Sequence, residues 1–191
     1  MDAPAGRGEQ ALPDAMVQSW SAYHVFGAYE MAANSLVDFA ESQYETGEIL
    51  PVSPSTRYIR QPQFSLFWPI WLYQQYLYGG DRDLAVRMVP HLDEFLAFLE
   101  SQAGERHLLK GLGEECTLRN FRDWVGVPSA ATSTALNALY CRTLFSSARF
   151  LDLLGETHAA HELRRRATHT TKAIRALSWD AEQEQFADSA T

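Results

Sequence analysis

The sequence predicts an all-α protein built from helical hairpins. Apolar residues recur every three to four positions over most of the 191 residues, whereas the alternating apolar and polar pattern of strands is nearly absent. A hydrophobic fraction of 46% and a charged fraction of 21% are typical of a globular chain, and the length allows one domain or part of a larger one. We therefore expect helices that bury a shared core.

The first helical segment follows a loose start that is rich in Gly and Pro. We assign residues 1–13 to this loose N-terminus and residues 14–191 to the helical domain. The apolar spacing in the first part of the domain predicts either one long helix or two helices with a break near Gly27. Residues 44–62 combine Gly and Pro with Ser and Thr, which is typical of a loop.

A charge-free segment at residues 64–78 predicts the most deeply enclosed helix. Aromatic and aliphatic side chains cover its whole circumference, so we expect it to be buried on nearly all sides. Gly79 and Gly80 end this helix, and Asp81 is a good N-cap for a further helix. These two helices form a hairpin.

Residues 103–130 predict a long ordered loop, which is followed by a second helical hairpin. Its first helix starts near Thr132 and stops at Gly155, and its second helix starts near Thr157. Residues 179–186 predict a short β-hairpin or an extended tail. The helices are spaced too unequally for a solenoid of ~33- or ~34-residue repeats, which favours an α/α toroid of concentric helix layers.

The charge and the composition argue against several kinds of partner. The formal net charge of −8 disfavours nucleic acid and anionic lipid. The segment at residues 64–78 is shorter than the ~20 residues that cross a bilayer. No secretory signal is visible, so a cytoplasmic location is the default. Cys116 and Cys141 form no CxxC pair and the six histidines form no HExxH motif, so we expect neither a metal nor a cofactor.

The long loop holds the densest cluster of reactive side chains. Asp123 and Trp124 pair a carboxylate with a flat ring, which suits a sugar, because hydroxyls bind polar acceptors and the C–H face of a pyranose packs on an aromatic ring. In the alternative interpretation, Asp123 caps a turn and Trp124 fills the core. Glu114 and Glu115 are candidates for the acid and base of glycoside hydrolysis, although adjacent side chains point in different directions.

Several segments share their order and spacing with one enzyme family. They are Ser35-Leu-Val-Asp-Phe-Ala-Glu-Ser-Gln43, Gln61-Pro-Gln-Phe-Ser-Leu-Phe-Trp-Pro-Ile-Trp-Leu-Tyr73, Tyr78-Gly-Gly-Asp81, Phe121-Arg-Asp-Trp-Val125, Leu136-Asn-Ala-Leu-Tyr140, Leu154-Gly155, Trp179-Asp180 and Phe186-Ala-Asp-Ser189. Over residues 35–191 the chain thus resembles the six-hairpin (α/α)6 catalytic domain of bacterial α-L-rhamnosidases. Asp123 and Trp124 match an aspartate-tryptophan pair that lines the family's sugar pocket, and the resemblance also implies, on a weaker match, that Phe64 and Trp68 on the inner helix line it.

The resemblance implies an inverting glycosidase, in which a carboxylic acid protonates the leaving oxygen and a carboxylate activates water. The family's acid lies in an acidic motif upstream of residue 35, and residues 1–34 do not match it, Glu30 included. The family's base comes from a later hairpin.

We therefore expect a fragment of an α-L-rhamnosidase-like glycoside hydrolase that acts on rhamnose-containing glycosides. This fragment contributes pocket wall, lacks the catalytic acid and base, is inactive alone and has the missing portions of the same domain as its partner. The alternative is a self-contained helical binding or scaffold module without catalysis.

Overall fold

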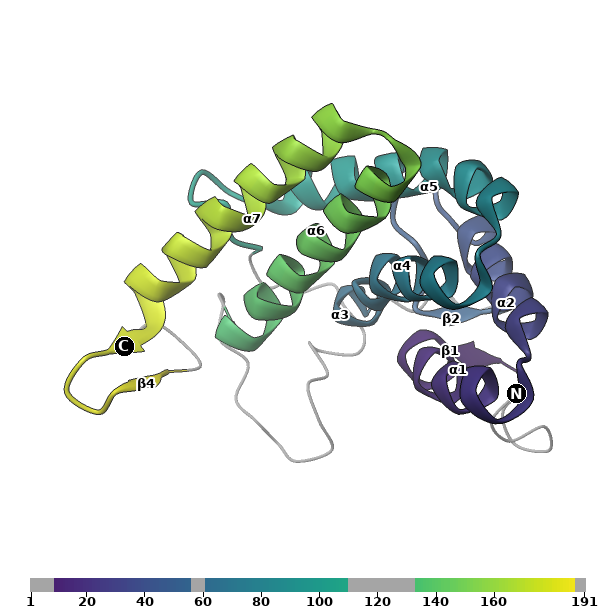
Figure 1. Ribbon diagram of the computed structural model, residues 1–191. Coiled ribbons are helices and arrows are strands. Elements are labelled where there is room, and N and C mark those ends of the chain that lie inside the picture. Colours follow the sequence, from purple (N-terminus) through teal and green to yellow (C-terminus); the bar gives the residue numbers. More distant parts are fainter. Residues whose placement is uncertain (1–8, 56–60, 110–132, 188–191) are drawn as a thin grey trace.

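The computed structural model confirms the all-α prediction (Figure 1). It describes residues 9–55, 61–109 and 133–187. The helices are α1 Leu12–Phe26, α2 Tyr29–Glu41, α3 Pro62–Ser65, α4 Phe67–Gly79, α5 Arg82–Gln102, α6 Thr134–Leu154 and α7 Thr157–Ser178. Two short antiparallel pairs join β1 Gln10–Ala11 to β2 Val52–Ser53 and β3 Trp179–Asp180 to β4 Gln185–Phe186. None of the helices in these ranges is long and apolar enough to cross a membrane.

Helices α4 and α6 lie side by side and run in the same direction. Near the start of α4, the Thr143 hydroxyl of α6 donates a hydrogen bond to the Leu66 carbonyl at 2.9 Å. Near the end of α4, the rings of Tyr76 and Phe150 meet edge to face, with centroids 5.9 Å apart. Sequence numbers thus rise together along both helices.

Helix α1 lies on the other side of α4 and is also parallel to it. The Trp20 indole N–H donates to Gln74 Oε1 at 2.9 Å, and one turn later the His24 imidazole lies 3.3 Å from the Tyr78 hydroxyl. The three parallel helices α1, α4 and α6 form one layer.

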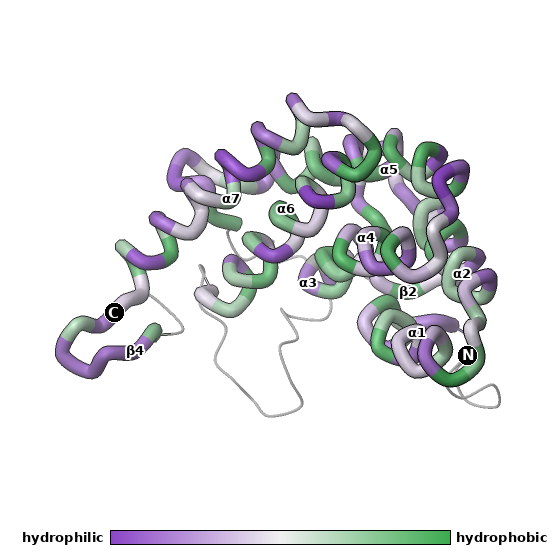
Figure 2. The backbone as a smooth tube through the Cα atoms, in the orientation of Figure 1, coloured by the Kyte–Doolittle hydropathy of each residue, from purple (hydrophilic) through white to green (hydrophobic). Residues whose placement is uncertain are grey.

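Helices α2, α5 and α7 return in the opposite direction and form the second layer (Figure 1). The hairpins are therefore α1–α2, α4–α5 and α6–α7, with α5 also packed against α2 and α6. Along α5 and α7, hydrophobic and hydrophilic residues alternate around the helix, as expected where one side faces the first layer (Figure 2). Alternation of two layers through successive hairpins is the architecture of a toroid sector.

The structure decides between the two alternatives for the first helical segment and corrects the predicted extent of the loose start. Of the two alternatives for the first segment, the structure has two helices, because Gly27 adopts the left-handed conformation with φ 60° that ends α1. The loose start does not extend through Pro13. Residues 10–11 pair with β2, and α1 begins at Leu12, with Pro13 in its first turn, where a missing N–H costs nothing.

The helix signals in the rest of the chain are confirmed. Asp81 caps α5 by accepting the Leu84 N–H at 2.9 Å. Gly155 ends α6 with φ 95°, and α7 begins at Thr157. Two alternatives were predicted for the C-terminal end, an extended tail and a β-hairpin. The antiparallel pairing of β3 with β4 shows that it is a hairpin.

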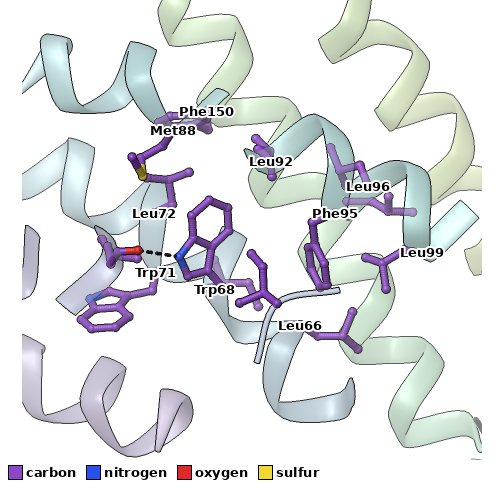
Figure 3. Close-up of a cluster of buried hydrophobic side chains, with 14 of the residues drawn as sticks. Leu66, Trp68, Trp71, Leu72, Met88, Leu92, Phe95, Leu96, Leu99 and Phe150 are labelled. Carbon is purple, nitrogen blue, oxygen red and sulfur yellow. Dashed lines mark hydrogen bonds between the residues drawn. The ribbon is translucent and has the colours of Figure 1, made fainter. Parts of the chain in front are cut away.

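The core is centred on α4, although this helix is not enclosed on all sides. Trp68, Ile70, Trp71 and Leu72 are buried, and Figure 3 shows Trp68 and Trp71 among leucines and aromatic rings of α4, α5 and α6. Leu77 and Tyr78 in the last turn are 55% and 43% exposed. The prediction of burial on nearly all sides is wrong for this last turn, which borders a groove along α1, α4 and α6.

Candidate functional site

The N-terminal ends of α4 and α6 lie at the same end of the domain, because the two helices are parallel. Helix α3, which carries Phe64, leads into α4 there. Residues 110–132 are flanked by Leu109 and Ser133, and both flanks lie beside the first turn of α6. We call this region the site end: α3, residues 108–109 and the first turns of α4 and α6.

Asn137 holds both flanks of residues 110–132 in place. Its Oδ1 accepts the Leu109 N–H at 2.7 Å, and its Nδ2 donates to the carbonyls of Leu109 and Ser133 at 3.0 and 2.9 Å. The side chain is only 1% exposed. Because a buried amide needs partners for both of its ends, this arrangement fixes where the connecting segment leaves and rejoins the domain.

The sequence prediction assigned no role to Asn137. The available signal was a polar amide in an otherwise apolar stretch of a helix, since buried polar side chains are nearly always hydrogen-bonded. The partner Leu109 lies 28 residues away in sequence, and no local pattern identifies it.

The predicted sugar-binding residues Asp123 and Trp124 lie outside the described residues, as do Glu114 and Glu115. Their roles remain predictions. Leu109 and Ser133, which flank residues 110–132 in the sequence, are both hydrogen-bonded to Asn137 at the site end.

The structure places the other two predicted site residues differently. Phe64 is half-buried in α3 at the site end, and its N–H donates to the Gln61 carbonyl at 2.8 Å. Trp68 has no exposed surface, and its indole N–H donates to the Leu36 carbonyl at 3.1 Å. This burial argues against contact between Trp68 and a sugar and favours a core role.

The C-terminal hairpin is tied to the same end of α6. The Thr134 hydroxyl lies 2.7 Å from both Ser178 Oγ and the Ala187 carbonyl oxygen. Beyond it, the rings of Trp179 and Phe186 pack edge to face with centroids 5.0 Å apart. The start of α6 is thus held by the hairpin as well as by Asn137.

A hollow of about 440 Å³ lies between α6, α7 and this hairpin. Cys141 lies in its wall, where burial raises the pKa of the thiol above its ordinary value, while a contact with Thr171 opposes the rise. A thiol with a raised pKa is protonated at neutral pH and is a poor nucleophile. We therefore expect Cys141 to behave as an unreactive buried thiol.

One carboxyl group with a raised pKa, Asp93, lies away from the site end. Burial, and then the charge of Glu156, raise the pKa of Asp93. A raised carboxylate pKa beside a second carboxylate is a feature of catalytic acids. Glu156, however, lies in the turn after the C-terminal end of α6, at the opposite end from the site, and Asp93 lies in the second layer on α5. The pair does not belong to the candidate site.

Comparison with known proteins decides the family. The model of the bacterial alpha-L-rhamnosidase 6 hairpin glycosidase domain matches residues 10–191. The chain belongs to this family. No curated protein matches the chain. The family match confirms the resemblance inferred from the sequence and extends it toward the N-terminus, over α1 and most of the described residues.

Solved structures support the same fold for this chain. The GH78 family rhamnosidase of Bacillus sp. GL1 is 23% identical with a TM-score of 0.84, over 95% of this chain and 19% of that one. A rhamnosidase from Klebsiella oxytoca with rhamnose bound is 17% identical with a TM-score of 0.85, over 99% of this chain and 37% of that one. The chain thus spans well under two thirds of either protein.

Proposed function

We propose that this chain forms part of the catalytic domain of a glycoside hydrolase that cleaves rhamnose-containing glycosides. The observation that carries the proposal is the match of the six-hairpin glycosidase family to residues 10–191. The layered hairpins and the TM-scores of 0.84 and 0.85 to two rhamnosidases support it.

In this proposal the chain supplies pocket wall at the site end. Asp123 would accept hydrogen bonds from sugar hydroxyls, and Trp124 would present an apolar face to the ring. Asn137 holds Leu109 and Ser133, the two flanks of the segment that carries them in the sequence. An inverting reaction also requires an acid and a base on opposite sides of the scissile bond.

We propose further that this acid and this base come from residues outside the chain. The groove along α1, α4 and α6 and the hollow beside Cys141 are both lined without any Asp or Glu. Glu30 is exposed on α2, in the second layer. Neither of these two hollows therefore supplies a pair of carboxylates.

The chain alone is expected to show no turnover of an aryl α-L-rhamnoside. An oxocarbenium-like transition state needs both a proton donor and a carboxylate that activates water, and a pocket wall supplies neither. Release of the chromogenic aglycone above a buffer blank, followed through successive purification steps, is the measurement. Activity that copurifies with the chain would contradict the proposal, and Glu114 and Glu115 would then be the first residues to replace.

If the surrounding reading frame encodes the rest of the domain, Trp124→Ala in that longer protein is expected to lower kcat/KM by roughly 10- to 1000-fold. A tryptophan that walls the sugar pocket contributes stacking and apolar contact in the transition state, which is worth about 1.4 to 4 kcal/mol. Steady-state kinetics and a thermal melt of the same preparations measure the two effects separately.

Trp179→Ala is the matched control, because Trp179 is half-exposed and packs on Phe186 of the hairpin. It should keep near-normal kinetics per folded molecule. If Trp124→Ala loses stability while its folded fraction keeps full activity, Trp124 is a core residue and the pocket assignment is wrong. A reading frame that encodes no further part of the domain would favour the self-contained binding module.

A further inference from the structure

Directly after α5 the chain makes a turn that packs against α7. We call residues 103–109 the α5 turn. An isolated antiparallel bridge between Ala103 and Leu109 closes it, and within it the His107 N–H donates to the Gly104 carbonyl at 2.8 Å. The turn therefore has hydrogen bonds of its own, and its position against α7 depends on further contacts.

His107 joins the tip of the α5 turn to α7 in two ways. Its carbonyl accepts a hydrogen bond from the Thr170 hydroxyl at 3.0 Å. Its imidazole packs against the imidazole of His169, with ring centroids 5.3 Å apart and planes inclined by 46°. The backbone of His107 is left-handed, with φ 56°, a conformation that a residue other than glycine keeps only where its surroundings favour it. The contacts with α7 are part of these surroundings.

The two imidazoles can both take up protons from solvent. His107 is exposed and His169 is half-buried. Among the ion pairs formed by the described residues, none involves either histidine of this pair. Histidine side chains ordinarily change charge between pH 5 and 8. One proton places a charge beside a neutral ring, whereas two protons place like charges in direct contact, where they repel each other.

The charged groups of α7 and α5 do not relieve this repulsion. Arg165 and Arg166 lie one turn before His169, and Lys172 lies one turn after it. The carboxylates beside the two arginines are already paired with them, at 2.8 and 3.4 Å. They are Glu162 of α7 and Glu100 of α5.

The turn itself and α6 add little net charge near the pair. Glu105 and Arg106, which precede His107 in the turn, carry opposite charges. On α6, burial raises the pKa of Tyr140 and of Cys141, so both side chains stay uncharged between pH 5 and 8. A second proton on the histidine pair therefore meets more cations than free carboxylates.

We propose that His107 and His169 form a pH-sensitive clip, which holds the α5 turn against α7 at neutral pH and releases it when both rings are protonated. The contact is complete where at most one ring is charged, and it is lost as the pH falls toward 5. Leu109 at the end of the turn is held separately by Asn137, so the release concerns the tip of the turn. The proposal goes beyond the proposed function and does not depend on it.

Hydrogen exchange of the 191-residue chain, followed by NMR at pH 7.5 and pH 5.0, tests the clip. Protection is expressed relative to an unstructured chain at the same pH, which removes the intrinsic pH dependence of exchange. We expect the protection of the His107 amide to fall at least ~10-fold at the lower pH. The Leu12 amide, which donates to the Pro51 carbonyl at 2.9 Å, should change by less than ~3-fold. In about 1 M NaCl, where the Debye length is ~3 Å, the fall at His107 should shrink.

Two variants each remove one ring of the pair. His169→Gln replaces the ring on α7, and His107→Asn replaces the ring in the turn with a residue that tolerates the left-handed conformation. In both variants the His107-position amide should have the same protection at the two pH values within ~3-fold. His158→Gln is the matched control, because it removes an exposed imidazole of α7 about three turns away, and it should keep the ~10-fold fall.

Circular dichroism at both pH values verifies that the parent chain and the variants are folded. Equal protection of the His107 amide at pH 7.5 and pH 5.0 in the parent chain would overturn the proposal. A fall that persists in His169→Gln and His107→Asn would overturn it as well, because other groups would then cause it. An equal fall at Leu12 would show general acid unfolding in place of a local clip. No rhamnoside turnover enters the measurement, so the rhamnosidase proposal can stand or fall separately.

Discussion

Asn137→Ala is expected to destabilise the chain by about 2 to 5 kcal/mol. The substitution removes a buried amide that bonds both backbone groups of Leu109, and each buried polar group left without a partner costs about 1 to 3 kcal/mol. Leu109 is itself buried, so water cannot readily replace the lost partner. Chemical denaturation followed by circular dichroism measures the free energy of unfolding.

Hydrogen exchange gives a second measurement that is specific to the site end. The Leu109 amide should lose most of its protection in Asn137→Ala, because its hydrogen-bond acceptor is gone. Ser147→Ala is the control: Ser147 is also fully buried on α6, but its hydroxyl bonds only the Thr143 carbonyl within the same helix. The control should cost about 1 kcal/mol or less. Unchanged Leu109 protection in Asn137→Ala would show that Asn137 does not hold this flank.

Asn137→Asp separates hydrogen bonding from packing. The aspartate keeps the shape of the side chain and the acceptor for the Leu109 N–H, but a carboxylate oxygen replaces the donor that faces the carbonyls of Leu109 and Ser133. A buried carboxylate that keeps one donor but turns its second oxygen toward two carbonyl oxygens is costly, so at neutral pH this variant should be at least as unstable as the alanine variant. Stability equal to the parent chain would contradict the geometry.

The features that could be predicted from the sequence are set by interactions between residues that are close in the chain. Asp81 accepts the N–H of Leu84, three residues away, and Gly155 ends α6 because a glycine tolerates positive φ. Such signals act within one turn, so a single sequence contains them in full. The periodicity of apolar residues adds which segments are helical, and the unequal helix spacing was enough to favour a toroid over a solenoid.

The features that were missed depend on contacts between distant segments. Asn137 meets Leu109 only after α6 packs against the end of the preceding loop. The groove residues of α4 were predicted to be enclosed, because aromatic and aliphatic side chains have the same helical spacing whether they line a groove or fill a core. Leu77 and Tyr78 are the clearest case: their segment carries no charge, yet they are exposed.

Trp68→Ala is expected to cost about 3 to 5 kcal/mol of folding stability, the usual effect of removing a large aromatic side chain from a core. Trp68 has no exposed surface and lies beside Leu92 and Phe95 of α5 (Figure 3). Its indole N–H also bonds the Leu36 carbonyl of α2, so one side chain joins three helices. A loss of this size is a large part of the ~5 to 15 kcal/mol that stabilises a typical domain.

Trp20→Ala is the matched control, because it removes the same side chain from a position that is 37% exposed. Its cost should be about 1 kcal/mol, from one hydrogen bond to Gln74 and partial burial. If Trp68→Ala prevents folding altogether, Trp68→Phe keeps a ring in the core and should cost about half as much. Denaturant midpoints of the variants, measured with the same probe, place them on one scale.

The same Trp68→Phe substitution in the proposed longer protein tests whether Trp68 lines a sugar pocket, as the resemblance implied. A core residue affects how much protein is folded and leaves kcat/KM per folded molecule nearly unchanged, whereas a pocket residue lowers kcat/KM even in fully folded protein. Because Trp68 is enclosed by α2, α4 and α5, we expect the first outcome. A fall in kcat/KM of ~10-fold or more without loss of stability would return Trp68 to the sugar site and would require the core around it to open when substrate binds.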